Sequence, residues 1–337
     1  VLGNNAFGID LGTSNIKIYN RNDDKITIEK NMIAIENKDT LFAYGNSAFE
    51  MYEKAPGTIH ISYPLSNGVI ADMKHMETLI KYFIGDLCRH NIKPADYYIA
   101  VPTDVTDVER RAFYNLLKDA NVKDRAVMVV EKAVADGLGM DIDVKNSQGV
   151  LVVDVGYDTT EISILSLGGI VLSRLIKVGG QKFDDAIRAA IRREFSLIVG
   201  GKTAENVKIS LKDLEKEGKS AVVYGRDIVT GLPVEREIPT ALVDDSLTEH
   251  FNTIIDNVKV ILERTPPELA ADIYRHGVYL TGGASQVNHL SELLSGGTGL
   301  KVQVSENPMS SVALGLAKII KEDNYKTVAS VIEGTGK

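Results

Sequence analysis

The chain has 337 residues, which is enough for two domains of common size. With 44% hydrophobic and 25% charged residues, its composition is that of a globular protein and excludes a disordered or fibrous chain. A formal net charge of −8 argues against nucleic acid as a partner, because general binding to nucleic acid needs a surplus of Lys and Arg against phosphate. Cys88 is the single cysteine, so these residues hold no internal disulfide and we expect a cytoplasmic protein.

Residues 7–19 have the pattern of a β-hairpin with a glycine turn. An apolar run ends at Asp10, a turn follows at Gly12, and an alternating strand begins soon after. Glycine allows a ligand to approach the backbone, and successive amide groups in a tight turn form a concave site for anions. Thr13 and Ser14 add hydroxyl groups beside that turn. The pattern predicts a phosphate-binding hairpin.

Residues 151–165 repeat this pattern nearly half the chain later. An apolar run ends at Asp154 and a second glycine turn begins at Gly156, followed by further polar side chains: Tyr157, Asp158, Thr159 and Thr160. Mg2+ usually keeps several waters and binds through one or two carboxylates together with phosphates, so Asp10 and Asp154 are candidate Mg2+ residues, acting through water. Either hairpin alone is also ordinary turn chemistry. Facing each other, the two would hold the phosphates of a nucleotide between two halves of the protein.

Residues 277–285 form a third glycine element. A short apolar strand leads into Gly282, Gly283 and Ala284, and apolar residues then recur at helical spacing. A strand, a glycine turn and the N-terminus of a helix favour binding of a nucleotide. Alone, the element could equally be a plain strand-to-helix turn with Ser285 as the helix N-cap.

These three elements, in this order, resemble the nucleotide site of the actin-like ATPase superfamily. Further phrases resemble the MreB family of bacterial actin-like, rod shape-determining filament proteins, and together they cover about the whole chain; they lie at residues 67–72, 101–112, 166–171, 202–208, 230–233 and 262–269. The resemblance implies an α/β fold of two similar domains with ribonuclease H-like cores. Each domain would carry a small inserted subdomain, and the nucleotide would lie in the cleft between them.

The resemblance also implies subdomain boundaries. The first large subdomain would comprise residues 1–31, 71–148 and 312–337, with a small subdomain at 32–70. The second large subdomain would comprise 149–178 and 241–311, with a small subdomain at 179–240.

Local patterns predict several elements independently of any family. Strands are expected at 97–101 and 126–130, and strands alternating with helices favour a layered α/β domain. Residues 76–88 form an apolar helical stripe, and Thr106 with Glu109 forms a capping box at the start of a second helix. We also expect a helix from Ser246 to Pro266, a last helix from Ser310, β-like structure at 211–240, and a frayed tail after residue 322.

The resemblance adds catalytic roles and further binding positions to these residue patterns. It implies that Glu131 and Thr160 position the attacking water. The glycine turns would hold the phosphates of ATP or ADP, and the remaining cofactor-binding positions would be Gly180, Glu205, Lys208, Gly282, Gly283 and Ala284.

The chain also departs from the family pattern at the site. Tyr157 and Asp158 stand where glycines are expected, Lys132 replaces a proline after Glu131, and Ala284 replaces a third glycine. These changes predict slow or deficient hydrolysis.

Three functions stay open at this point. The first is an ATP-binding, filament-forming cytoskeletal protein that helps determine cell shape by organising cell-wall synthesis, with a slow ATPase coupled to polymerisation. Its partners would be further copies in a head-to-tail filament, other MreB-type proteins and wall-synthesis membrane proteins, with peripheral contact at the inner face of the cell membrane. The second is a divergent paralogue that binds nucleotide and forms filaments but hydrolyses ATP poorly. The third is a chaperone-type or metabolite-kinase ATPase on the same fold.

Overall fold

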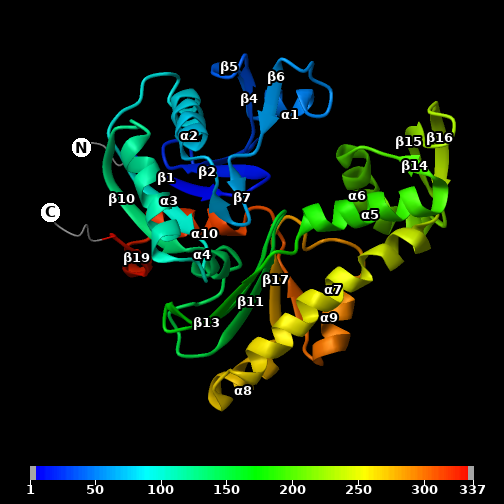
Figure 1. Cartoon of the computed structure of the whole chain (residues 1–337). Coiled ribbons are helices and arrows are strands. Elements are labelled where there is room, and N and C mark those ends of the chain that lie inside the picture. Colours follow the sequence, from blue (N-terminus) through cyan, green and yellow to red (C-terminus); the bar gives the residue numbers. More distant parts are fainter. Residues whose placement is uncertain (1–4, 333–337) are drawn as a thin grey trace.

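The computed structural model describes residues 5–332, and the chain forms two α/β halves around two large sheets (Figure 1). The first sheet has the order β19-β10-β9-β1-β2-β3, and the second has the order β13-β12-β11-β17-β18. The strands of the first sheet are β1 (Ala6–Leu11), β2 (Asn15–Asn20), β3 (Lys25–Lys30), β9 (Ala95–Val101), β10 (Asp124–Glu131) and β19 (Ala329–Ser330). Those of the second are β11 (Val150–Val155), β12 (Thr160–Ser166), β13 (Gly169–Ile176), β17 (Val278–Thr281) and β18 (Val302–Val304).

Each half also carries a small sheet. One has the order β5-β4-β6 and the other β14-β15-β16, and both lie toward the upper side of Figure 1. Their strands are β4 (Ile33–Glu36), β5 (Thr40–Tyr44), β6 (Ile59–Ser62), β14 (Leu197–Ile198), β15 (Ala221–Asp227) and β16 (Pro233–Ile238); β7 (Leu65–Ser66) and β8 (Val69–Ile70) form a separate two-stranded ribbon. The predicted two-domain α/β architecture with a small sheet in each half is therefore present. The subdomain boundaries stay a prediction, and their ends at 1–4 and 333–337 lie outside the described residues.

The helices cover both large sheets. They are α1 (Asn46–Met51), α2 (Met73–Leu87), α3 (Asp107–Asp119), α4 (Lys132–Gly139), α5 (Gly180–Phe195), α6 (Gly201–Glu217), α7 (Thr240–Glu263), α8 (Pro267–His276), α9 (Leu290–Thr298), α10 (Ser311–Lys321) and the 3-10 helix η1 (Asp323–Val328). β1 and β11 are buried along their whole length, as expected for strands covered on both faces. None of the helices within residues 5–332 combines the length and apolar character needed to cross a bilayer.

Both predicted hairpins form, with the same register. Asp10 on β1 lies opposite Lys17 on β2, and Asp154 on β11 lies opposite Glu161 on β12. Each hairpin sits at the centre of its large sheet, because β1 also pairs with β9 and β11 also pairs with β17. The two glycine turns are thus carried by the most buried strands of each half.

Helix α10 returns to the first half and packs against α4. A Cβ atom on Gly315 would lie 1.8 Å from the carbonyl oxygen of Ala135, and one on Gly139 would lie 1.8 Å from that of Ser311. Glycine at both positions is therefore required for the two backbones to approach so closely. This contact fixes α4, whose first residue is Lys132.

Several local expectations are confirmed. The Thr106–Glu109 capping box is present at the start of α3, and the apolar stripe lies on α2, buried from Met76 to Ile84 and partly buried at Leu87 and Cys88. The last helix begins at Ser311, with Ser310 in the N-cap position.

Other expectations were wrong. Residues 211–217 belong to α6 rather than to a β segment, and α7 begins at Thr240, six residues before Ser246. Helix α9 begins at Leu290, so the glycine turn is not followed directly by a helix, and Ser285 donates its hydroxyl proton to the carbonyl of Gly282 instead of capping one. The expected frayed tail contains η1 and then β19, which pairs with β10 at Val129 and Val130.

Candidate functional site

A cavity of about 1020 Å³, including space open to solvent, lies between the two halves. Its walls come from both glycine hairpins, the third glycine element and helices α4, α5, α6 and α10. The predicted site residues that line it are Asp10, Gly12, Thr13, Ser14, Asp154, Gly156, Tyr157, Asp158, Thr159, Gly180, Glu205, Lys208, Gly282, Gly283 and Ala284. The fold therefore brings together positions that are nearly 275 residues apart in the sequence.

The two hairpin turns close in the same way. The amide of Gly12 donates to the carbonyl of Asn15, and the amide of Gly156 donates to that of Thr159, each at 2.9 Å. A Cβ on Gly12 would lie 2.6 Å from the carbonyl oxygen of Asn15, so this turn accepts only glycine without rearrangement.

Gly282 in the third element is required for a different reason. Its φ is +102°, and a Cβ there would lie 2.5 Å from Oδ1 of Asp154. Glycine therefore lets the third element pack directly against the second hairpin.

The second turn also contacts the first half. The carboxylate of Asp158 accepts a hydrogen bond from the backbone amide of Asn67 and another, at 3.4 Å, from the hydroxyl of Thr13. The ring of Tyr157 packs on that of Tyr63 with 5.9 Å between centroids. Tyr157 and Asp158, which stand where glycines were expected, thus hold the second hairpin against the first half across the cavity.

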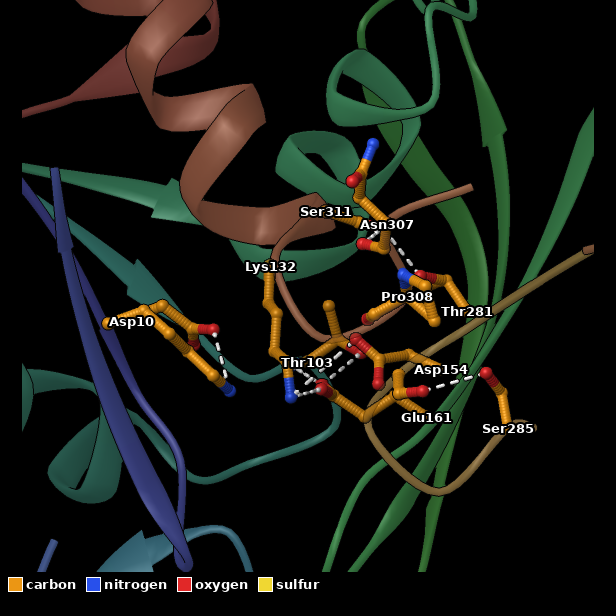
Figure 2. Close-up of polar contacts among 12 residues, drawn as sticks. Asp10, Thr103, Lys132, Asp154, Glu161, Thr281, Ser285, Asn307, Pro308 and Ser311 are labelled. Atoms are coloured by element: carbon orange, nitrogen blue, oxygen red, sulfur yellow. Dashed lines mark hydrogen bonds and ion pairs between the residues drawn. The ribbon is translucent and has the colours of Figure 1, made fainter. Parts of the chain in front are cut away.

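The floor of the cavity carries two carboxylate–lysine groups (Figure 2). In the first, Nζ of Lys17 lies 3.6 Å from Oδ2 of Asp10. In the second, Nζ of Lys132 lies 3.1 Å from Oε2 of Glu161 and 3.8 Å from Oδ2 of Asp154. Figure 2 shows Lys132 reaching from α4 toward Asp154 and Glu161.

The charges of the second group are strongly coupled. Burial opposes the charged form of Lys132, but the carboxylates of Asp154 and Glu161 outweigh it and raise the pKa of Lys132 well above its usual value. Burial acts to raise the pKa of Asp154, and Lys132 reverses this effect so that the pKa is lowered. Lys132 and Asp154 are therefore held as an ion pair.

Asp136 lies one helical turn after Lys132 and also lines the cavity. It is 1% exposed, and its carboxyl group forms a side-chain hydrogen bond with that of Asp154. Burial, followed by the nearby Asp154 carboxylate, raises the pKa of Asp136 well above its usual value, which favours its neutral form.

The opposite end of the cavity is lined by Gly180, Glu205 and Lys208. Gly180 is the first residue of α5, so the N-terminus of that helix faces the cavity, an arrangement that favours anions. Nζ of Lys208 lies 2.8 Å from Oδ1 of Asp184. Burial raises the pKa of Asp184 to about 6, against the opposing effect of Lys208.

The two residues expected to position water do not line the cavity. The Glu131 carboxylate pairs with Arg110, whose Nη1 lies 2.5 Å from Oε1; burial raises the pKa of Glu131 and Arg110 opposes this. Thr160 is fully buried and donates its hydroxyl proton to the carbonyl of Val178 at 2.7 Å. Their catalytic role stays a prediction.

Sequence reasoning missed four charged residues of the cavity: Lys17, Lys132 as a site residue, Asp136 and Glu161. Lys17 and Glu161 could have been found, because each follows from pairing the hairpin strands about the glycine turn. Lys132 and Asp136 have i,i+4 spacing directly after strand β10, which is a weaker signal.

The fold and the cavity define the class of the protein, which is actin-like. A crystal structure of MreB5 from Spiroplasma citri bound to ADP superposes with a TM-score of 0.87 and 34% identity, covering 96% of this chain and 98% of that one. The MamK double helical filament superposes with a TM-score of 0.77 at 21% identity, covering 94% and 99% of the two chains, and shows likeness of fold alone.

The sequence comparisons identify the family. The family model described as MreB/Mbl protein matches residues 4–328. The cell shape-determining protein Mbl of Bacillus subtilis (strain 168) is 37% identical over 313 residues, covering 91% of this chain and 93% of Mbl. The cell shape-determining protein MreB of Escherichia coli (strain K12) is 33% identical over 326 residues, covering 94% and 93%. The chain belongs to the MreB/Mbl family, which favours a cell-shape cytoskeletal protein over a chaperone-type ATPase or a metabolite kinase.

Proposed function

We propose that this chain binds ATP and ADP in the cavity between its halves and forms filaments that help determine cell shape by organising cell-wall synthesis. The observation that carries this proposal is the convergence of three glycine elements and both halves on one cavity. Relatives support it, since structures of MreB5 from Spiroplasma citri are described as bound to ADP and to AMPPNP.

The backbone would provide most of the phosphate site. The turns at Gly12 and Gly156 place amide groups and hydroxyls at the cavity, and the N-terminus of α5 adds a favourable helix end. Gly282, Gly283 and Ala284 leave room for the nucleoside, with Glu205 and Lys208 beside it.

Mg2+ fits the floor of this cavity. Asp10, Asp154 and Glu161 all line it and are buried, and carboxylate oxygens are the ligands that Mg2+ takes from proteins. Asp10 and Asp154 would hold the hydrated ion, which when bound supplies positive charge to the phosphates.

We expect hydrolysis of ATP to ADP and phosphate to be slow. Glu131, the expected water-positioning residue, is engaged by Arg110, and the hydroxyl of Thr160 is engaged by Val178. Asp158 also adds a negative charge at the phosphate end of the cavity. These contacts favour, as a second candidate, a paralogue that binds nucleotide and forms filaments with little turnover.

Assembly and location complete the proposal. A head-to-tail contact that does not close into a ring would generate a filament, and closure of the two halves around nucleotide would change that contact. We propose a cytoplasmic protein, in peripheral contact with the membrane, whose partners include other MreB-type proteins and wall-synthesis membrane proteins.

Phosphate release with ATP and Mg2+, combined with pelleting and electron microscopy of the same sample, tests the proposal. Nucleotide-dependent filaments whose turnover is abolished by Glu131→Ala would support the first function. The matched control is Glu249→Ala, on the exposed face of α7.

The double variant Tyr157→Gly, Asp158→Gly distinguishes the second candidate. Filaments or tight nucleotide binding without turnover, with turnover restored in this variant, would support the paralogue that hydrolyses little. The absence of both nucleotide binding and assembly would contradict both functions.

A further inference from the structure

The second hairpin places two carboxylates directly opposite each other. Asp154 and Glu161 are cross-strand partners, whereas the corresponding pair in the first hairpin is Asp10 with Lys17. Like charges at directly opposite positions destabilise a sheet. Both carboxylates are buried, with Asp154 6% and Glu161 3% exposed, so a compensating cation is needed.

Lys132 provides that cation from the other half of the molecule. It is the first residue of α4, and its Nζ lies 3.1 Å from Glu161 and 3.8 Å from Asp154. The glycine contacts with α10 hold the middle and the end of this helix, at Ala135 and Gly139. The backbone amide of Thr103 holds Glu161 in turn, at 2.8 Å from Oε1.

The ammonium group faces the cavity as well as the carboxylates. Lys132 lines the cavity together with both hairpin turns, and its side chain is 19% exposed. One lysine against two carboxylates leaves this group a net charge of −1, and without Lys132 the charge would be −2. Because Lys132 and its two carboxylate partners are largely buried, one unit of charge among them changes the free energy of a nearby polyphosphate substantially.

We propose that Lys132 is a built-in counter-ion of the nucleotide site, which supplies part of the positive charge that Mg2+ otherwise provides. Replacing Lys132 with a neutral residue should therefore make nucleotide affinity depend more strongly on Mg2+ than it does in the unmodified chain. In this role, Lys132 sets how strongly nucleotide binding requires a divalent cation. The inference rests on the proposed nucleotide binding.

The test is equilibrium binding of a fluorescent ADP analogue in excess Mg2+ and again in excess EDTA. The quantity compared is the ratio of the two dissociation constants, EDTA over Mg2+. Lys132→Met is expected to raise this ratio at least about tenfold over the unmodified chain, because the site becomes more negative. Glu161→Gln is expected to lower the ratio, because it removes a carboxylate and leaves Lys132 in place.

Two controls separate this role from a structural one. Lys259→Met removes a lysine from the exposed face of α7 and should leave the ratio unchanged. Lys132→Arg keeps the charge and should keep the ratio close to that of the unmodified chain. A purely structural role for Lys132 would weaken binding equally with and without Mg2+.

If circular dichroism shows that Lys132→Met is folded, the ratio of dissociation constants in this variant is the deciding measurement. If it is not folded, the ratio in Glu161→Gln is used instead. An unchanged ratio in the deciding variant, or a shift opposite to that expected, overturns the inference while leaving nucleotide binding intact. Failure of the unmodified chain to bind the ADP analogue even in excess Mg2+ overturns the proposed function itself.

Discussion

The two glycine hairpins share a backbone and differ in how their charges are balanced. The first is self-contained, because Asp10 is paired with Lys17 across the same hairpin. The second depends on the other half of the molecule: Lys132 compensates Asp154 and Glu161, and Asp158 binds the amide of Asn67. The same backbone motif therefore balances its buried charge within one hairpin in the first half and through a lysine from the other half in the second.

The largest expected effect on stability comes from replacing the lysine that compensates each hairpin, Lys132 or Lys17. Lys132→Met leaves two opposed buried carboxylates without a cation and should lower the free energy of unfolding by about 3–5 kcal/mol. Lys17→Met leaves only Asp10 unpaired, so its loss in free energy of unfolding should be about 1–2 kcal/mol smaller than that of Lys132→Met. Urea denaturation of both variants measures the difference, and equal losses would mean that the two lysines are equivalent.

The second half also carries a carboxyl group whose ionisation opposes folding. Burial raises the pKa of Asp184 to about 6, so the folded state binds a proton more tightly than the unfolded state. The contribution of Asp184 to stability should therefore fall as pH rises from about 4 to about 6, by roughly 2–3 kcal/mol.

Denaturant titrations of the unmodified chain and of Asp184→Asn across this pH range measure that contribution as a difference. Asp213→Asn, on the exposed face of α6, is the matched control. A difference that stays constant with pH would show that Asp184 is not the group responsible.

Replacing Gly12 or Gly156 with alanine tests how closely the backbone is packed in each turn. A Cβ on Gly12 would lie 2.6 Å from the carbonyl of Asn15, whereas one on Gly156 would lie 3.2 Å from that of Thr159. We expect Gly12→Ala to cost about 2 kcal/mol and Gly156→Ala less than about 1 kcal/mol. Thermal unfolding followed by circular dichroism tests the order, and the reverse order would contradict the geometry.

The smallest effect concerns the connection made by Asp158. Asp158→Ala removes the hydrogen bonds to Asn67 and Thr13, so the cavity should open more readily and ADP should dissociate about fivefold faster, as expected for the loss of about 1 kcal/mol. Stopped-flow displacement of a fluorescent ADP analogue measures this rate. Ser14→Ala, at the corresponding place in the first turn, should change the dissociation rate less. A larger effect of Ser14→Ala would contradict the assignment of this connection to the second hairpin.

Much of the fold could be predicted from local patterns in the sequence. The hairpins, the Thr106–Glu109 cap and the start of α10 were all predictable, because each depends on residues within a few positions of one another. The start of α7 was misplaced and α8 was missed. Pro239 was assigned to the β-like stretch at 211–240 and Pro266 to the end of the preceding helix, although proline is well suited to a helix start.

The gathering of the cavity residues was predictable only in part. Glycine turns and strand-end aspartates marked the phosphate end from the sequence, the glycine element at 277–285 marked the nucleoside end, and the family resemblance added Gly180, Glu205 and Lys208. Lys132 was noticed as a departure from the family pattern rather than as a charge in the cavity. Its partners Asp154 and Glu161 are more than 20 residues away, so no local pattern links them to it.

The duplicated hairpins, the α/β class and the family could be inferred from the order of the amino acids, because they depend on local spacing and on short motifs shared with relatives. The distribution of charge over the cavity depends instead on how the chain packs. The packing of α4 on α10 through Gly139 and Gly315 places Lys132 at the second hairpin, while the ion pair with Arg110 holds Glu131 outside the cavity. Electrostatic interactions act through space between chain segments, so they are settled only when packing has fixed the distances between them.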